Sequence, residues 1–190
     1  MNILSSWLND LGAQDANLRE NALVAIYDHA LNQARDTISS LQADPAMSGL
    51  LTGSMIAAVA VSPGRFLELK TAWDVRECAK MPAALKGKIS EFTIYAPKKP
   101  LDILTTEFKG TGEPDAISKF LSNRGEGIQH IELYVTDVEK ASQCISLISA
   151  LNASQIHPAP IDGADNTKIN FFLCRPKNSN KILIELVQAP

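Results

Sequence analysis

Residues 125–141 read GEGIQHIELYVTDVEKA, and residues 181–188 read KILIELVQ. Each stretch contains the short apolar run of a β-strand with a polar residue set among apolar ones, His130 in the first and Glu185 in the second. A buried carboxylate needs a partner, because burying an unpaired charge is energetically costly. A neutral imidazole and a carboxylate on neighbouring strands are suitable ligands for a divalent metal ion. The two stretches therefore predict where a functional site lies.

Each of these polar residues also has a purely structural interpretation. His130 can be a half-buried imidazole bonded to a backbone carbonyl, and Glu185 can pair across strands with Lys168 or Lys181. Apolar residues flank Glu185 on both sides, which favours an inward-facing carboxylate. Glu132 follows His130 by two positions and so shares its face of the strand. There it can support the site or act as an acid or base, although exposure at a sheet edge is the simpler expectation.

The composition is that of an ordinary soluble domain. A length of 190 residues allows one sizeable core, or one domain with an appendage. The net charge of −3 and the lack of a Lys/Arg block argue against a nucleic-acid surface. Cys78, Cys144 and Cys174 are odd in number and lack metal-site spacing, which fits a reducing compartment. The N-terminus lacks the pattern of a signal peptide, and the most apolar window, residues 55–61, is too short to cross a membrane. We therefore expect a cytoplasmic protein without membrane or nucleic-acid partners.

The first fifty residues differ in pattern from the rest of the chain. Apolar residues recur there at spacings of three and four, which predicts an amphipathic helix that ends at Asp44-Pro45. A shorter helix over residues 3–11 is expected before it. Residues 1–50 are therefore interpreted as an N-terminal helical extension, and residues 51–190 as a separate domain.

From residue 54 onward one order of elements occurs twice: a strand, a helix, then two or three strands. The two copies, about 54–108 and 128–188, share pattern rather than identity. They predict an α+β fold in which paired βαβββ modules form a curled mixed sheet around one cavity. The expected elements are strand 55–61, helix 65–80, strands 89–95 and 101–108, then strand 128–135, helix 138–151 and strands 168–174 and 182–187.

Several motifs of the second half occur in a fixed order and spacing. They are Lys119-Phe120-Leu121, Arg124-Gly125-Glu126-Gly127, Ile128-Gln129-His130-Ile131, Val135-Thr136-Asp137-Val138 and Leu183-Ile184-Glu185-Leu186. In these motifs the chain resembles the vicinal-oxygen-chelate superfamily, which includes glyoxalases, bleomycin-resistance proteins and dioxygenases. Within it, the second half is most similar to methylmalonyl-CoA epimerases. The match covers about residues 105–188.

The resemblance implies an octahedral divalent metal ion held by four side chains, two from each module. His130 and Glu185 correspond to the pair from the second module. Glu107 corresponds to the ligand that ends the first module, with Asp102 as the alternative if the turn carries an insertion. The fourth ligand would be a histidine near residue 55, but residues 53–56 read Gly-Ser-Met-Ile.

Two interpretations of this gap remain open. Either three side chains and additional waters hold the metal and leave positions for a substrate, or the site is degenerate and the protein binds a ligand without turnover. The other two histidines do not fill the gap readily. His29 lies in the helical pattern and is expected on a helix surface, and His157 is expected at a loop or pocket rim. Zinc, nickel, cobalt, manganese and iron all fit the expected site.

The resemblance implies a metal-dependent isomerase or lyase that acts on a small carbonyl compound or thioester through an enolate. Glu185 or Glu107 would then serve as both ligand and base, or Glu91 would approach from strand 89–95. The alternative is a non-catalytic member that binds a small molecule at a degenerate metal site. A third interpretation makes the helical extension an interaction module. The resemblance also allows a homodimer.

Overall fold

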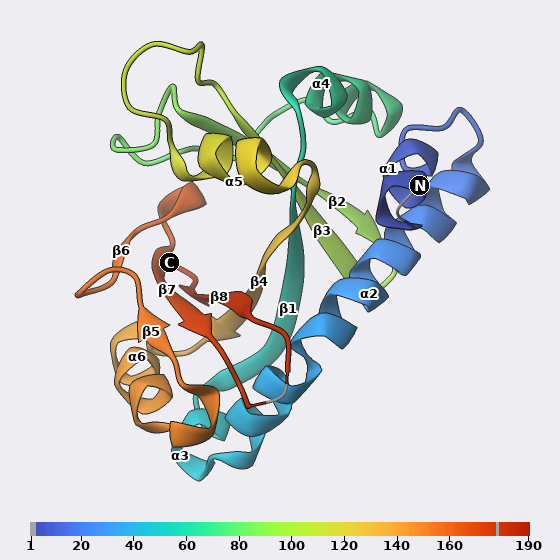
Figure 1. The fold of residues 1–190 in the computed structure, drawn as a ribbon. Helices are drawn as coiled ribbons and strands as arrows, with labels where there is room; N and C mark the ends of the chain where they lie inside the picture. Colours follow the sequence, from blue (N-terminus) through green and yellow to red (C-terminus); the bar gives the residue numbers. More distant parts are fainter. Residues whose placement is uncertain (1–2, 178) are drawn as a thin grey trace. The chain divides into compact units, whose positions relative to one another are not determined.

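The computed structural model describes residues 3–177 and 179–190 and contains both helices and strands (Figure 1). The helices are α1 (Ile3–Asp10), α2 (Ala16–Ala43), α3 (Pro45–Ser48), α4 (Pro63–Ala72), α5 (Ala116–Arg124) and α6 (Val138–Leu147), with short 3₁₀ turns at Ser149–Leu151 and Ala164–Asn166. The strands are β1 (Leu51–Ala60), β2 (Ile89–Ala96), β3 (Lys99–Thr106), β4 (Gly127–Val135), β5 (Ser154–Gln155), β6 (Ile161–Asp162), β7 (Lys168–Cys174) and β8 (Ile182–Gln188). Among the described residues, no helix combines the length and apolarity that a membrane span requires.

The chain forms two compact units. Unit 1 contains the residues up to His29 and Ala57–Gln129, and unit 2 contains Ala30–Ile56 and His130–Pro190. Helix α2 and strands β1 and β4 therefore each contribute residues to both units. The helices of the first fifty residues are present as expected. The proposed boundary at residue 50 stays a prediction.

Unit 1 contains a mixed sheet in which β3 pairs with β2 antiparallel and with the end of β1 in parallel. Its buried residues include Val59, Phe92 and Ile103. Helix α4 begins after Ser62, whose hydroxyl accepts a hydrogen bond from the Arg65 backbone amide. The Arg65 guanidinium also donates to Glu126 at 2.7 Å and to the Leu8 carbonyl at 3.1 Å, so it ties the end of α1 to α4.

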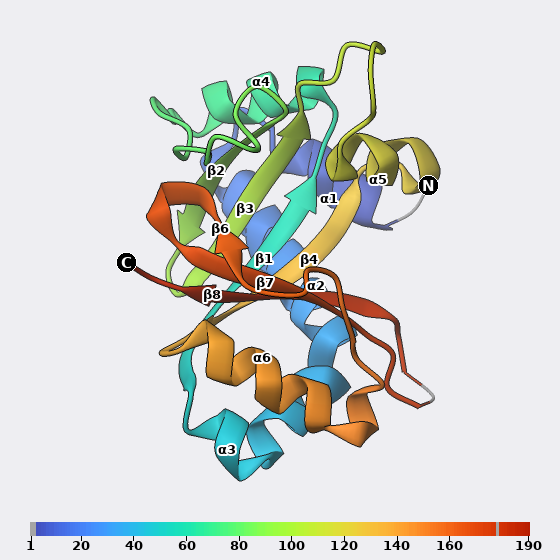
Figure 2. The same ribbon diagram turned by 90° about the vertical axis from the view of Figure 1, so that its left-hand side faces the viewer.

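In unit 2, strand β8 of the mixed sheet pairs with β4 in parallel and with β7 antiparallel. The short strands β5 and β6 both pair with β7. Helix α6 lies against β7 and β8 on one side (Figure 2). Asp137 caps this helix by accepting a hydrogen bond from the Lys140 backbone amide at 3.0 Å. Because side chains alternate along strands, the opposite face of this sheet is the one that carries His130 and Glu185.

The α+β class and the order strand, helix, strands in each half are confirmed. The helix expected over residues 65–80 is shorter, because α4 ends at Ala72 and Asp74 adopts a positive φ of 49°, outside the helical region. In the first half two strands follow the helix, and the second of them ends at Thr106 rather than residue 108. The segment between α6 and β7 also contains the short strands β5 and β6, which were not predicted from the sequence.

Two serines of α6 provide a test of how unit 2 is held together. Ser142 and Ser146 each donate to the carbonyl four residues earlier, but only Ser142 is buried and accepts a hydrogen bond from Asn170 of β7, at 3.0 Å. Ser142→Ala should lower the free energy of unfolding by about 1–3 kcal/mol, because the buried Asn170 amide loses its acceptor. Ser146→Ala should change it by less than about 0.5 kcal/mol. Urea denaturation measures both, and equal effects would contradict a stabilising Ser142–Asn170 contact.

Candidate metal centre

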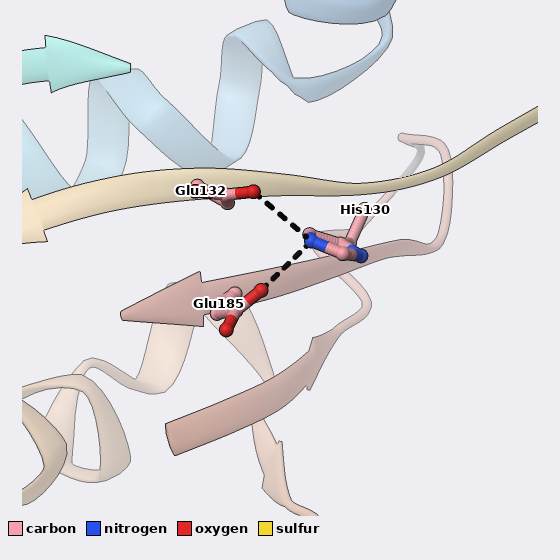
Figure 3. A group of neighbouring side chains, drawn as sticks. All are labelled: His130, Glu132 and Glu185. Carbon is pink, nitrogen blue, oxygen red and sulfur yellow. Dashed lines mark ion pairs between the residues drawn. The ribbon is translucent and has the colours of Figure 1, made fainter. Parts of the chain in front are cut away.

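Three ionisable side chains converge on one face of the sheet in unit 2 (Figure 3). His130 and Glu132 lie on β4, and Glu185 lies on β8 directly opposite Glu132 in the parallel register. His130 Nε2 is 2.8 Å from Glu185 Oε2 and 3.6 Å from Glu132 Oε1. The cluster therefore brings one imidazole nitrogen and two carboxylates together.

The alternation of β4 and β8 explains this convergence. Ile131 and Ile184 pair in the register, are fully buried, and point to the face against which α6 packs. Their neighbours His130, Glu132 and Glu185 must then point to the opposite face. That face is also covered, since the three residues are only 5%, 7% and 8% exposed. Polar residues buried to this degree need strong mutual interactions.

An aromatic side chain flanks the cluster. Phe171 of β7 lies opposite Glu185 in the antiparallel register, and its ring meets the His130 ring edge-on, at 5.5 Å between centroids and 87° between planes. His157 contacts the same ring at 6.2 Å from the loop between β5 and β6. Phe171 thus forms an apolar wall between two imidazoles, and His157 occupies a loop, as predicted.

The two carboxylates govern the protonation of His130. Burial by itself lowers the pKa of this imidazole, but the charge of Glu185 and hydrogen bonds to Glu132 and Glu185 outweigh burial and raise the pKa to about 10. Without a metal ion, the cluster therefore holds a proton at neutral pH. The imidazole then lies as a cation between two acceptors.

The same donor set fits a divalent metal ion. The three potential ligand atoms all lie within 4.8 Å of one another and come from buried side chains. Imidazole nitrogen and carboxylate oxygen are ligands for zinc, manganese, iron and cobalt. A divalent ion would take the place of the proton and neutralise both carboxylates, so the residues present fit the cofactor that the resemblance implies.

The structure brings His130 and Glu185 together, as the strand pattern predicted. The structure contradicts the pairing of Glu185 with Lys168 and the exposure of Glu132, while the pairing of Glu185 with Lys181 stays a prediction. Lys168 pairs with Asp162 rather than with Glu185, and Glu132 is buried rather than exposed at a sheet edge. The alternation of side chains along β4 correctly predicted that Glu132 points to the same face of the sheet as His130. The burial of Glu132 depends on what covers that face of the sheet, which a local sequence pattern does not predict.

Glu107 lies in unit 1, just after β3, and is exposed. Its carboxylate accepts a hydrogen bond from the Ser90 hydroxyl, and it lines a pocket of about 320 Å³ together with Phe66 and Phe108. Asp102, the alternative, is buried within β3. The assignment of Glu107 as metal ligand and catalytic group stays a prediction.

The remaining candidates from the sequence are also placed. His29 lies in α2 and meets the Trp7 ring edge-on at 5.5 Å, as expected for a helix residue. Glu91 lies within β2 in unit 1 and is half-buried. Ser54 and Met55 lie within β1, where the resemblance would require a histidine.

The raised pKa of His130 predicts how the stability of the metal-free protein depends on pH. The folded state binds the proton more tightly than the unfolded state, whose histidine has a pKa of about 6.5. The contribution of His130 to the free energy of unfolding is therefore complete below pH 6.5 and declines from there up to about pH 10. Urea unfolding in chelator across this range should show the decline, and His130→Gln should remove it. A wild-type profile that matches the variant would contradict the ion pair.

Comparison with solved structures identifies the fold. Methylmalonyl-CoA epimerase from Mycobacterium tuberculosis matches with a TM-score of 0.56, covering 75% of this chain and 92% of its own, at 23% identity. The chain has the fold of these epimerases. A variant of the Streptomyces coelicolor methylmalonyl-CoA epimerase, in complex with 2-nitronate-propionyl-CoA, matches with a TM-score of 0.54 over 73% of this chain and 98% of its own, at 20% identity.

The structure of a hypothetical protein from Bacillus halodurans C-125 also matches this chain. Its TM-score is 0.53 at 20% identity, over 71% of this chain and 92% of its own. No protein-family model and no curated protein sequence matches the chain. The resemblance to the vicinal-oxygen-chelate superfamily is therefore confirmed for the fold. At these identities the reaction has to be argued from the site.

Proposed function

We propose that this protein is a metal-dependent isomerase or lyase of the vicinal-oxygen-chelate type that acts on a small carbonyl compound or thioester. The observation that carries the proposal is the buried contact of 2.8 Å between His130 Nε2 and Glu185 Oε2. These two residues were predicted from the sequence as the metal pair of the second module. They lie together in a fold shared with epimerases.

The reaction would consist of proton transfers at a carbon next to a carbonyl group. A divalent ion, when bound, supplies positive charge that stabilises the negative charge developing on the carbonyl oxygen. The proton moves from the substrate carbon to a carboxylate oxygen of Glu185 or Glu107, while the C–H electron pair moves toward the carbonyl. Return of a proton to the same carbon completes an isomerisation, and loss of a leaving group from the adjacent carbon completes an elimination.

Other residues of the cluster would prepare this chemistry. Before a metal ion binds, Glu132 and Glu185 orient the imidazole of His130 through their contacts with Nε2. Phe171 shields one side of that ring from water, which strengthens the electrostatic interactions at the site. The polar groups are therefore held in place before a substrate arrives.

Acyl thioesters are the first substrate class to test. Solved epimerases of this fold were obtained in complex with methylmalonyl-CoA and with 2-nitronate-propionyl-CoA. The test uses wild-type protein purified without chelators, its metal content, and the exchange of α-protons of methylmalonyl-CoA and of small hydroxyketones in D₂O, followed by NMR. We expect about one divalent ion per chain and exchange that stops in chelator. A protein without metal and without exchange would refute the proposal.

The second candidate is a non-catalytic protein that binds a small molecule in the same place. The observation that favours it is the stretch Gly53-Ser54-Met55-Ile56 in β1, which offers no imidazole where the four-ligand pattern needs one. The same experiment separates the two functions. Saturable binding of a thioester without proton exchange would support the binding protein.

A further inference from the structure

We infer that the metal ligands of this protein are His130, Glu132 and Glu185, so that a single module carries the complete set. The inference rests on the proposed metal-dependent function and replaces the four-ligand, two-module site that the resemblance implies. It assigns Glu132 as a metal ligand and excludes Glu107 as one.

The distances within the cluster suit three ligands of one ion. Ligands about 2.1 Å from a metal ion are separated by about 3.0–3.4 Å in octahedral or tetrahedral geometry. The contacts of His130 Nε2 to Glu185 and Glu132, at 2.8 and 3.6 Å, bracket this separation. The direct pairing of Glu132 with Glu185 in the β4–β8 register keeps the two carboxylates level with each other, on the same face of the sheet as His130. Small side-chain shifts are therefore enough to enclose an ion.

Charge and burial support the same set. Glu132 and Glu185 lie side by side with less than a tenth of each residue exposed, and two buried carboxylates repel each other. With a neutral imidazole the cluster carries a charge of −2, which a divalent ion neutralises. If His130 only formed an ion pair with one glutamate, a second buried carboxylate would not be needed.

In unit 1, Asp102 of β3 is a buried carboxylate, whereas the two positions that the resemblance implies first offer no buried ligand. Glu107 is exposed and accepts a hydrogen bond from Ser90, and β1 contains Ser54 and Met55 where a histidine was expected. Three ligands from one face leave further positions of an octahedral ion open for substrate oxygens or water. One nitrogen and two oxygen donors without sulfur favour manganese, iron, cobalt or zinc over soft ions such as copper(I).

The test measures the affinity of the whole chain for Co²⁺, from its visible absorption, and for Mn²⁺, from its paramagnetic resonance. Glu132→Gln keeps the shape of the side chain but removes its charge. Its loss of affinity should exceed the roughly 10–100-fold that is typical of losing a residue which merely supports a ligand. Glu107→Gln should bind within about twofold of wild type, as should Glu139→Gln, a matched exposed glutamate of α6.

Circular dichroism first establishes that each variant is folded. If Glu132→Gln does not fold, Glu132→Asp keeps the carboxylate on a shorter stem and should bind with intermediate affinity. The inference is overturned if Glu132→Gln binds the ions with wild-type affinity, or if Glu107→Gln loses its affinity for them. Either result leaves the proposed function standing. A wild-type protein that binds neither ion overturns both.

Discussion

His130→Ala is expected to abolish stoichiometric binding of a divalent metal ion and, with it, catalytic turnover. His130 supplies the nitrogen ligand of the buried cluster. Its Nε2 lies 2.8 Å from the Glu185 carboxylate and 3.6 Å from the Glu132 carboxylate. Alanine removes the imidazole that contacts both Glu132 and Glu185, so the two buried carboxylates lose their shared partner. The loss of metal affinity should be larger than about 100-fold, beyond that typical of losing a supporting residue.

The measurement is metal content per chain after purification without chelators, together with α-proton exchange of a thioester. His29→Ala is the matched control, because His29 is a helix residue against Trp7 in unit 1. It should retain wild-type metal content. A folded His130→Ala protein that still carries one metal ion per chain would remove His130 from the site and with it the proposed mechanism.

The sequence was sufficient to predict the parts of the site that depend on local pattern. Alternation along β4 and β8 placed His130, Glu132 and Glu185 on faces that could be derived by counting. The motifs around Asp137 and Leu183–Leu186 gave the fold. These features need only short stretches of chain, and the structure reproduces them.

The remaining features depend on contacts between distant residues. Glu132 meets Glu185 because β4 and β8 pair in one register although more than forty residues separate them, and neither strand encodes that register alone. The burial of Glu132 follows from what covers its face of the sheet. Similarly, the early end of α4 coincides with the side chain of Trp73 donating to the Leu11 carbonyl, a contact with a distant part of the chain.

Glu185→Met is expected to destabilise the metal-free protein by about 3–5 kcal/mol, the typical cost of removing one partner from a buried ion pair. Methionine has a similar volume, so little of the effect should come from a cavity. His130 then keeps only the longer contact with Glu132, at 3.6 Å. Urea denaturation at neutral pH in chelator measures the change. Leu183→Met, on the same face of β8, is the control and should cost less than about 1.5 kcal/mol.

Replacing the whole cluster should have the opposite effect on stability. In the triple variant His130→Leu, Glu132→Met and Glu185→Met, no buried charge remains to be solvated or paired. Such apolar replacements are often neutral or stabilise a protein by about 1–4 kcal/mol. A triple variant at least as stable as wild type, but unable to bind metal, would mean that the cluster lowers stability and is present for function. A triple variant as unstable as Glu185→Met would make the cluster a structural element and remove the energetic argument for the metal site.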